Sequence, residues 1–127
     1  MRKTLTVFLA YGSSHIGGRV LGRISGLPNI SVVGQAQSAD EAIDLIATKK
    51  PRLVILDVFL VNGNGLDVLR NLRRRGSQTL VMMTSTSKFS QDRRECMKEG
   101  AEYFYHLPDE IEAMSTTVRE LASETRN

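Results

Sequence analysis

Cysteine is nearly absent from this chain, since Cys96 is the only one among its 127 residues. A lone cysteine cannot form an internal disulfide, and the charged stretch around it, 92–99, favours an inert thiol over a reactive one. No apolar run approaches the roughly 20 residues that a membrane-spanning helix needs, and residues 1–4 show no cleavage-site pattern. These absences exclude a disulfide-stabilised scaffold and lead us to expect a cytoplasmic protein that does not enter a membrane.

Signals of nucleic-acid binding are also sparse. The sequence has no helix-turn-helix segment, no zinc-ligand pattern and no ladder of aromatic and basic residues, and its net charge is only +3. The densest basic cluster consists of Arg70, Arg73, Arg74 and Arg75. Such a cluster could meet phosphate or an acidic partner, but it is also typical of a solvated helix end, where cations complement the helix dipole. We favour the second interpretation and expect no nucleic-acid partner.

Apolar runs alternate with segments of helical period along the whole chain, which fits a single domain, 1–127, with one core. The runs that we interpret as strands are 5–10, 30–34, 53–56, 80–83 and a fifth that begins at Tyr103. The segments that we interpret as helices are 14–26, a segment that follows Ser38, 66–74, 90–99 and 110–122. Ser38 is the expected N-cap of the second helix, and Glu41 completes a capping box. This alternation predicts an α/β fold, a doubly wound three-layer sandwich around a parallel sheet.

Asp57 is the best-placed candidate for chemistry because it ends the third predicted strand. Ligands of open α/β sheets bind outside the carboxyl ends of the strands. The loops 10–14, 84–87 and 106–109 follow other predicted strands and reach the same edge. The function therefore depends on the side chains that these loops bring to Asp57.

Four segments around this edge resemble a known family. They are Leu53-Val54-Ile55-Leu56-Asp57, Gly65-Leu66-Asp67-Val68-Leu69, Met82-Met83-Thr84-Ser85 and Gly100-Ala101-Glu102-Tyr103-Phe104. In this order and spacing, the chain resembles the receiver domain of bacterial two-component response regulators over essentially its whole length. The resemblance implies a flavodoxin-like fold, with a five-stranded parallel sheet in the order 2-1-3-4-5 and five helices.

The resemblance also implies a site for phosphoryl transfer from the phosphohistidine of a partner kinase. It assigns Asp57 to the phosphoacceptor position and Phe104 to the switch aromatic, and the hydroxyl position falls on Thr84 or Ser85. The backbone carbonyl of Phe59 would be a ligand of Mg²⁺, which neutralises the charge that gathers during transfer. A domain of this family is a signalling module, so we expect that the protein is not an enzyme.

Three positions depart from the family pattern. Where the family has an acidic pair after the first strand, this chain has Tyr11 and Gly12, and where the family has a lysine after the fifth strand, it has Leu107. Without the acids, Mg²⁺ would be left with Asp57, the Phe59 carbonyl and water, which is a poor site for a cation that dehydrates reluctantly. We therefore expect no metal and no other cofactor, with Mg²⁺ bound only if the site is functional.

Neighbouring side chains offer little compensation for these losses. His106 precedes Leu107, but alternate strand residues point to opposite faces of a sheet, so we expect His106 to point away from Asp57. The Tyr11 hydroxyl is a candidate hydrogen-bond donor to Asp57. The peptide before Pro108 is left open between cis and trans, since most X-Pro bonds are trans.

The favoured hypothesis is an atypical receiver, or pseudo-receiver, that acts through protein-protein contacts with phosphorylation lost or weakened. The alternatives are a receiver that a histidine kinase phosphorylates on Asp57 and a small-molecule-binding module on the flavodoxin-like scaffold. The expected partner is a histidine kinase or an output protein, which would bind the face formed by the fourth helix, the fifth strand and the fifth helix, near 88–124. A weak homodimer through the same face is left open.

Overall fold

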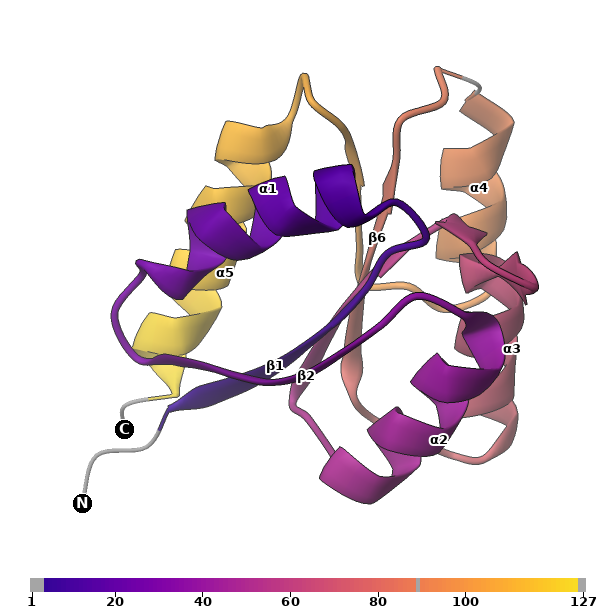
Figure 1. Cartoon of the computed structure of the whole chain (residues 1–127), viewed down its shortest axis with the longest axis horizontal. Coiled ribbons are helices and arrows are strands. Elements are labelled where there is room, and N and C mark those ends of the chain that lie inside the picture. Colours follow the sequence, from indigo (N-terminus) through magenta and orange to yellow (C-terminus); the bar gives the residue numbers. More distant parts are fainter. Residues whose placement is uncertain (1–3, 89, 126–127) are drawn as a thin grey trace.

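The computed structural model describes residues 4–88 and 90–125, so the expected domain of residues 1–127 extends beyond the described residues at both ends. Its main feature is a five-stranded parallel sheet in the order β2-β1-β3-β6-β7 (Figure 1). The strands of this sheet are β1 (Leu5–Ala10), β2 (Ile30–Ala36), β3 (Leu53–Asp57), β6 (Leu80–Ser85) and β7 (Tyr103–His106). Because β6 and β7 are the fourth and fifth strands of this sheet along the chain, the predicted order 2-1-3-4-5 is confirmed, and so is the flavodoxin-like fold.

The helices of the described residues lie in two layers, one on each side of the sheet. They are α1 (Ser14–Ser25), α2 (Ala39–Lys49), α3 (Gly65–Arg74), α4 (Ser90–Lys98) and α5 (Ile111–Glu124). Helices α1 and α5 cover one face, and α2, α3 and α4 lie over the other (Figure 1). No helix in residues 4–88 and 90–125 is long and apolar enough to cross a membrane.

Two apolar clusters form the core, and the central strand contributes to both. Every residue of β3 is buried, as expected for a strand that is covered on both faces. Val20 of α1 and Met114 of α5 belong to the first cluster, and Ile46 of α2 and Leu69 of α3 belong to the second. Cys96 of α4 is also buried in the second cluster, and burial raises the pKa of its thiol to about 11, which agrees with the expectation of an inert thiol.

Side-chain caps set the starts of three helices, α1, α2 and α3. Ser38 accepts a hydrogen bond from the Glu41 N–H at 3.2 Å, as predicted for the N-cap of α2. The Glu41 carboxylate accepts from the Gln37 N–H at 3.1 Å, so the return bond of the capping box is displaced by one residue. Helix α3 begins one residue earlier than predicted because Asn64 caps it by accepting from the Asp67 N–H at 2.9 Å.

Several predicted boundaries were wrong near the carboxyl ends of the strands. Strand β2 continues to Ala36, and β6 continues to Ser85, which pairs in register with His106 of β7. Polar side chains at the end of β6 resemble a loop in sequence, although the backbone still pairs. A short antiparallel hairpin of β4 (Phe59–Leu60) and β5 (Gly63–Asn64) was not predicted, because two-residue strands are too short to show an alternating pattern.

Candidate functional site

A chain of hydrogen bonds joins three buried side chains at the carboxyl edge of the sheet. Asp57 ends β3 and lies opposite Thr84 of β6 in the strand register. The Thr84 hydroxyl donates to Asp57 Oδ1 at 2.8 Å, and the Tyr11 hydroxyl lies 2.9 Å from Thr84 Oγ1. Because Thr84 has only one hydroxyl hydrogen, Tyr11 is the donor in the second bond. Tyr11 therefore reaches Asp57 through Thr84, whereas the sequence suggested a direct bond.

Burial sets the electrostatics of this chain of hydrogen bonds. Asp57 is only 4% exposed, and burial raises the pKa of its carboxyl group to about 6, although hydrogen bonds from Thr84 and Phe59 lower it. The bond from the Phe59 N–H to Asp57 Oδ2 is 3.2 Å long. Burial also raises the pKa of the Tyr11 hydroxyl, which therefore stays protonated and remains a donor. At neutral pH the site thus holds one poorly solvated negative charge.

The loop after β1 closes over the loop after β3. The Gly12 N–H donates to the Phe59 carbonyl at 3.1 Å, and the Tyr11 N–H donates to Ala36 at 3.0 Å. A Cβ atom added at Gly12 would lie 2.8 Å from the Phe59 oxygen and 3.1 Å from Leu60 Cα, so this loop has no space for a side chain at Gly12. Sequence reasoning missed this contact. The only signal for it is a glycine at a position where the family has an acid.

This closure gives a direct test of the loop geometry. We expect Gly12→Ala to lower the free energy of unfolding by about 2 kcal/mol, because the new methyl group overlaps backbone atoms that cannot move independently. Gly18→Ala is the matched control: outside its own helical turn and chain neighbours, no atom lies within 4 Å of the added Cβ, and alanine should stabilise helix α1 by about 0.5 to 1 kcal/mol. Urea denaturation measures both. Equal stability of Gly12→Ala and the wild type would contradict the closed loop.

Leu107 packs into the core at the end of β7. Its side chain is 3% exposed and belongs to the apolar cluster between the sheet and helices α1 and α5. The peptide between Leu107 and Pro108 is cis, which resolves the alternative left open by the sequence. His106 Nδ1 lies 3.3 Å from Asp109 Oδ2, so this imidazole pairs within its own loop. Among residues 4–88 and 90–125, no cation forms an ion pair with Asp57.

A comparison with known protein families covers the strand ends that carry Asp57 and Thr84. The family model described as the response regulator receiver domain matches residues 19–119, most of the chain. The chain belongs to this family. Receiver domains of response regulators are signalling modules.

Two curated relatives show how much of a response regulator this receiver domain represents. The nitrate/nitrite response regulator protein NarL of Escherichia coli is 33% identical over 79 residues, which are 62% of this chain and 37% of that protein. The response regulator MprA of Mycolicibacterium vanbaalenii is 31% identical over 90 residues, 71% of this chain and 39% of that protein. The chain therefore spans less than two fifths of the length of these relatives.

Solved structures support the fold of the receiver domain. The signal receiver domain of the putative response regulator NarL from Mycobacterium tuberculosis superposes with a TM-score of 0.86 at 20% identity, covering 95% of this chain and 98% of that chain. The response regulator domain of Thermotoga maritima CheB gives 0.82 at 22% identity, covering 98% of both chains. At this level of identity the likeness establishes the architecture and leaves the chemistry of the site to its own residues.

Ser85 and Phe104 lie on the face of the sheet opposite Thr84 in the receiver domain. The Ser85 hydroxyl lies 3.4 Å from Asp92 Oδ2, so Thr84 is the hydroxyl side chain that contacts Asp57. Phe104 is 7% exposed, and the Arg93 guanidinium stacks on its ring with 5.0 Å from Cζ to the ring centroid. Arg93 also pairs with Glu110 at 2.8 Å. Phe104, which the resemblance assigned to the switch aromatic, is therefore covered by a charged side chain of α4.

Metal-binding side chains do not gather at this edge. In the two described stretches, no group of three or more histidine, cysteine, aspartate and glutamate residues could hold a metal ion. Asp57 is the carboxylate that the strand ends supply, and both of its oxygens already accept hydrogen bonds. The Phe59 carbonyl, which the resemblance assigned to Mg²⁺, accepts the Gly12 N–H. Mg²⁺ requires near-octahedral oxygen ligands, and these residues do not fit it.

Proposed function

We propose that this receiver domain is a cytoplasmic signalling module that acts through protein-protein contacts, with the phosphoryl-transfer cycle lost or much weakened. The observation that carries the proposal is the bond from the Gly12 N–H to the Phe59 carbonyl, in a loop without space for a side chain at Gly12. The two loops that would have to separate around a metal ion are joined instead. A degenerate receiver would keep the fold and lose the ligand site.

Two further features support the loss of phosphoryl chemistry. During transfer, the negative oxygens of the phosphoryl group would approach the Asp57 carboxylate. Stabilising these oxygens needs a cation and a hydroxyl group that is free to donate. Leu107, where the family has a lysine, is buried among apolar side chains and supplies no charge. The Thr84 hydroxyl accepts from Tyr11 and donates its only hydrogen to Asp57, so it has no hydrogen left for a phosphoryl oxygen. The side chains of this site satisfy one another.

The partner surface of this proposal is the face of α4, β7 and α5. Met97 of α4 is 44% exposed, one of the largest apolar exposures of the described residues. On the same face, Arg93 joins α4 to Phe104 of β7 and to Glu110, which precedes α5. These contacts fix the relative positions of the three elements without any ligand at Asp57. A preformed surface of this kind suits a histidine kinase, an output protein or a second copy of the domain.

Mg²⁺ titration with beryllofluoride tests the proposal. We expect no saturable change in the NMR amide shifts around Asp57 up to about 10 mM Mg²⁺, because these residues do not supply the oxygen ligands that Mg²⁺ needs. We also expect no phosphorylated species by mass spectrometry after incubation with acetyl phosphate. Asp57→Asn is the matched control, since any signal from this site must vanish in it. Saturable binding at sub-millimolar Mg²⁺ that Asp57→Asn abolishes would refute the proposal.

A receiver that is phosphorylated on Asp57 is the second candidate. The observation in its favour is that the ionised Asp57 side chain is buried, which destabilises the fold. Burial raises the pKa of this carboxyl group to about 6, and a purely structural site would not need such a charge. It would require the loop at Gly12 to open before transfer. Incubation with a histidine kinase in its phosphorylated form discriminates: a phosphoprotein band that is absent in Asp57→Ala would establish this function in place of the first.

A further inference from the structure

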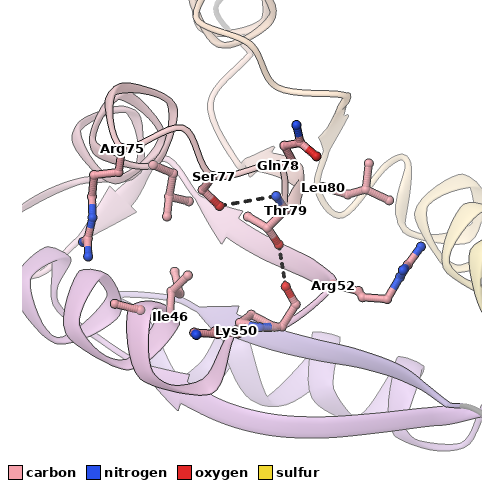
Figure 2. Close-up of a pocket in the computed structure, with 11 residues that line it drawn as sticks. Ile46, Lys50, Arg52, Arg75, Ser77, Gln78, Thr79 and Leu80 are labelled. Carbon is pink, nitrogen blue, oxygen red and sulfur yellow. Dashed lines mark hydrogen bonds between the residues drawn. The ribbon is translucent and has the colours of Figure 1, made fainter.

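A pocket lies at the opposite end of the sheet from Asp57. Its volume is about 630 Å³, and it opens between the carboxyl ends of α2 and α3, beside the first residues of β3 and β6 (Figure 2). Ile46 and Leu72 provide an apolar floor, whereas Lys50, Arg52 and Arg75 provide the charge. No carboxylate lines the pocket. The pocket therefore combines apolar surface with cations alone.

The cations of this pocket have no acidic partner among the described residues. The ion pairs of residues 4–88 and 90–125 involve none of Lys50, Arg52 and Arg75. Figure 2 shows Arg75, after α3, and Lys50, after α2, on the same side of the opening, with Arg52 extending on the other side. All three are exposed. Their charges are available to a bound molecule.

Helix dipoles do not account for all of these charges. Lys49 and Arg74, in the last turns of α2 and α3, fit the usual preference for cations at helix carboxyl ends. Arg52 belongs to no helix. Lys50 has φ of 50° and ψ of 55°, a left-handed conformation that glycine adopts at lower cost. A lysine held in this conformation beside the pocket contributes charge at the expense of stability.

Hydrogen bonds connect the segments that form the wall of the pocket. The Thr79 hydroxyl donates to the Pro51 carbonyl at 2.7 Å, which joins the starts of β6 and β3 (Figure 2). Arg73 Nη1 donates to the carbonyls of Ser77 and Thr79, each at 3.0 Å. These bonds hold the segment between α3 and β6 in one conformation. A ligand would not have to order this segment, so less binding energy is lost.

We propose that this pocket binds a short acidic segment of a partner protein, with an aliphatic side chain on the apolar floor and flanking carboxylates near Lys50 and Arg75. A protein segment fits better than nucleic acid, because no aromatic side chain lines the pocket for a base to stack on. An inorganic anion would leave the floor of Ile46 and Leu72 uncovered. The proposal goes beyond the function proposed above, since the pocket is separate from the site at Asp57.

Fluorescence anisotropy with a labelled nine-residue peptide tests this inference. The probe carries one central leucine between glutamates, and two variant probes replace the leucine by glycine or the glutamates by glutamine. We expect both variant probes to bind more weakly than the parent. We expect the double substitution Lys50→Gly with Arg75→Gln to weaken binding of the parent probe about fivefold, as the loss of two exposed ion pairs predicts. Glycine at residue 50 relieves the left-handed strain, so this variant should remain folded.

The matched control is Lys49→Gln with Arg74→Gln, which removes the same charge from neighbouring positions that do not line the pocket. It should weaken binding less than twofold, and Asp57→Asn should leave binding unchanged, which separates this inference from the one about Asp57. Equal losses in the two double variants would overturn the proposal in favour of net charge. It would also be overturned by absence of binding at millimolar protein, or by tighter binding of a single-stranded RNA of equal charge that Lys50→Gly with Arg75→Gln weakens.

Discussion

Arg73→Ala is expected to lower the free energy of unfolding by about 3 kcal/mol, the largest single effect that the structure predicts for an arginine of this domain. The Arg73 guanidinium donates to the Gly100 carbonyl at 3.1 and 2.9 Å from Nε and Nη2. It also donates to the carbonyls of Ser77 and Thr79 and pairs with Glu102 at 2.8 Å. Removal of the side chain leaves several partly buried carbonyls without donors, and bonds from charged groups contribute roughly 1.5 to 3 kcal/mol each before compensation by water.

Arg74→Ala provides the control for this loss. Arg74 is the next residue of α3, carries the same charge and is exposed, so its removal should change stability by less than about 0.5 kcal/mol. Arg73→Lys should recover less than half of the loss, because one ammonium group cannot reach the same set of carbonyls as a planar guanidinium. Chemical denaturation of the three variants measures these differences. Similar stabilities of Arg73→Ala and Arg74→Ala would mean that the bonds of Arg73 are replaced by water at little cost.

The fold could be predicted because it depends on patterns that extend over many residues. Buried parallel strands such as Leu53–Asp57 are almost entirely apolar, and helices that cover a sheet carry an apolar stripe. The features that the sequence did not predict depend on individual hydrogen bonds between backbone segments. The extension of β6 to Ser85 and the hairpin of β4 and β5 depend on backbone pairing with strands that are distant or very short. Periodicity carries no information about such pairing.

The candidate site was predictable in position and not in its contacts. Asp57, Thr84 and Tyr11 could be assigned to one edge of the sheet from topology, but the order of the hydrogen bonds among them depends on side-chain directions. The same limit applies to Arg73. Its cluster was interpreted as a solvated helix end, and this was wrong for Arg73, because a long side chain can reach carbonyls in another loop from that position. Composition alone does not distinguish an arginine that is solvated at a helix end from one that donates hydrogen bonds to carbonyls of another loop.

Asp57→Asn is expected to raise the free energy of unfolding by about 2 kcal/mol at pH 7.5. The pKa of the Asp57 carboxyl group is raised by burial from its ordinary value of 3.8 to about 6 in the folded protein. A shift of this size corresponds to a penalty of about 3 kcal/mol for the ionised form. Asparagine keeps an acceptor for the Thr84 hydroxyl and loses the one for the Phe59 N–H, which costs about 1 kcal/mol of this gain.

The pH dependence of this effect identifies its cause. Between pH 3.8 and about 6 the folded protein binds more protons at Asp57 than the unfolded chain does, so the contribution of Asp57 to stability falls as pH rises through this window. The advantage of Asp57→Asn should therefore be absent near pH 4, grow through that window and stay constant above it. Asp44→Asn, at an exposed carboxylate within α2, should differ from the wild type by less than about 0.5 kcal/mol at every pH. Urea denaturation between pH 4 and 8 measures both curves, and a difference for Asp57→Asn that does not vary with pH would show that a charge on Asp57 costs the folded protein nothing. A site that is destabilised by its own carboxylate and relieved by asparagine has kept Asp57 for a reason other than stability.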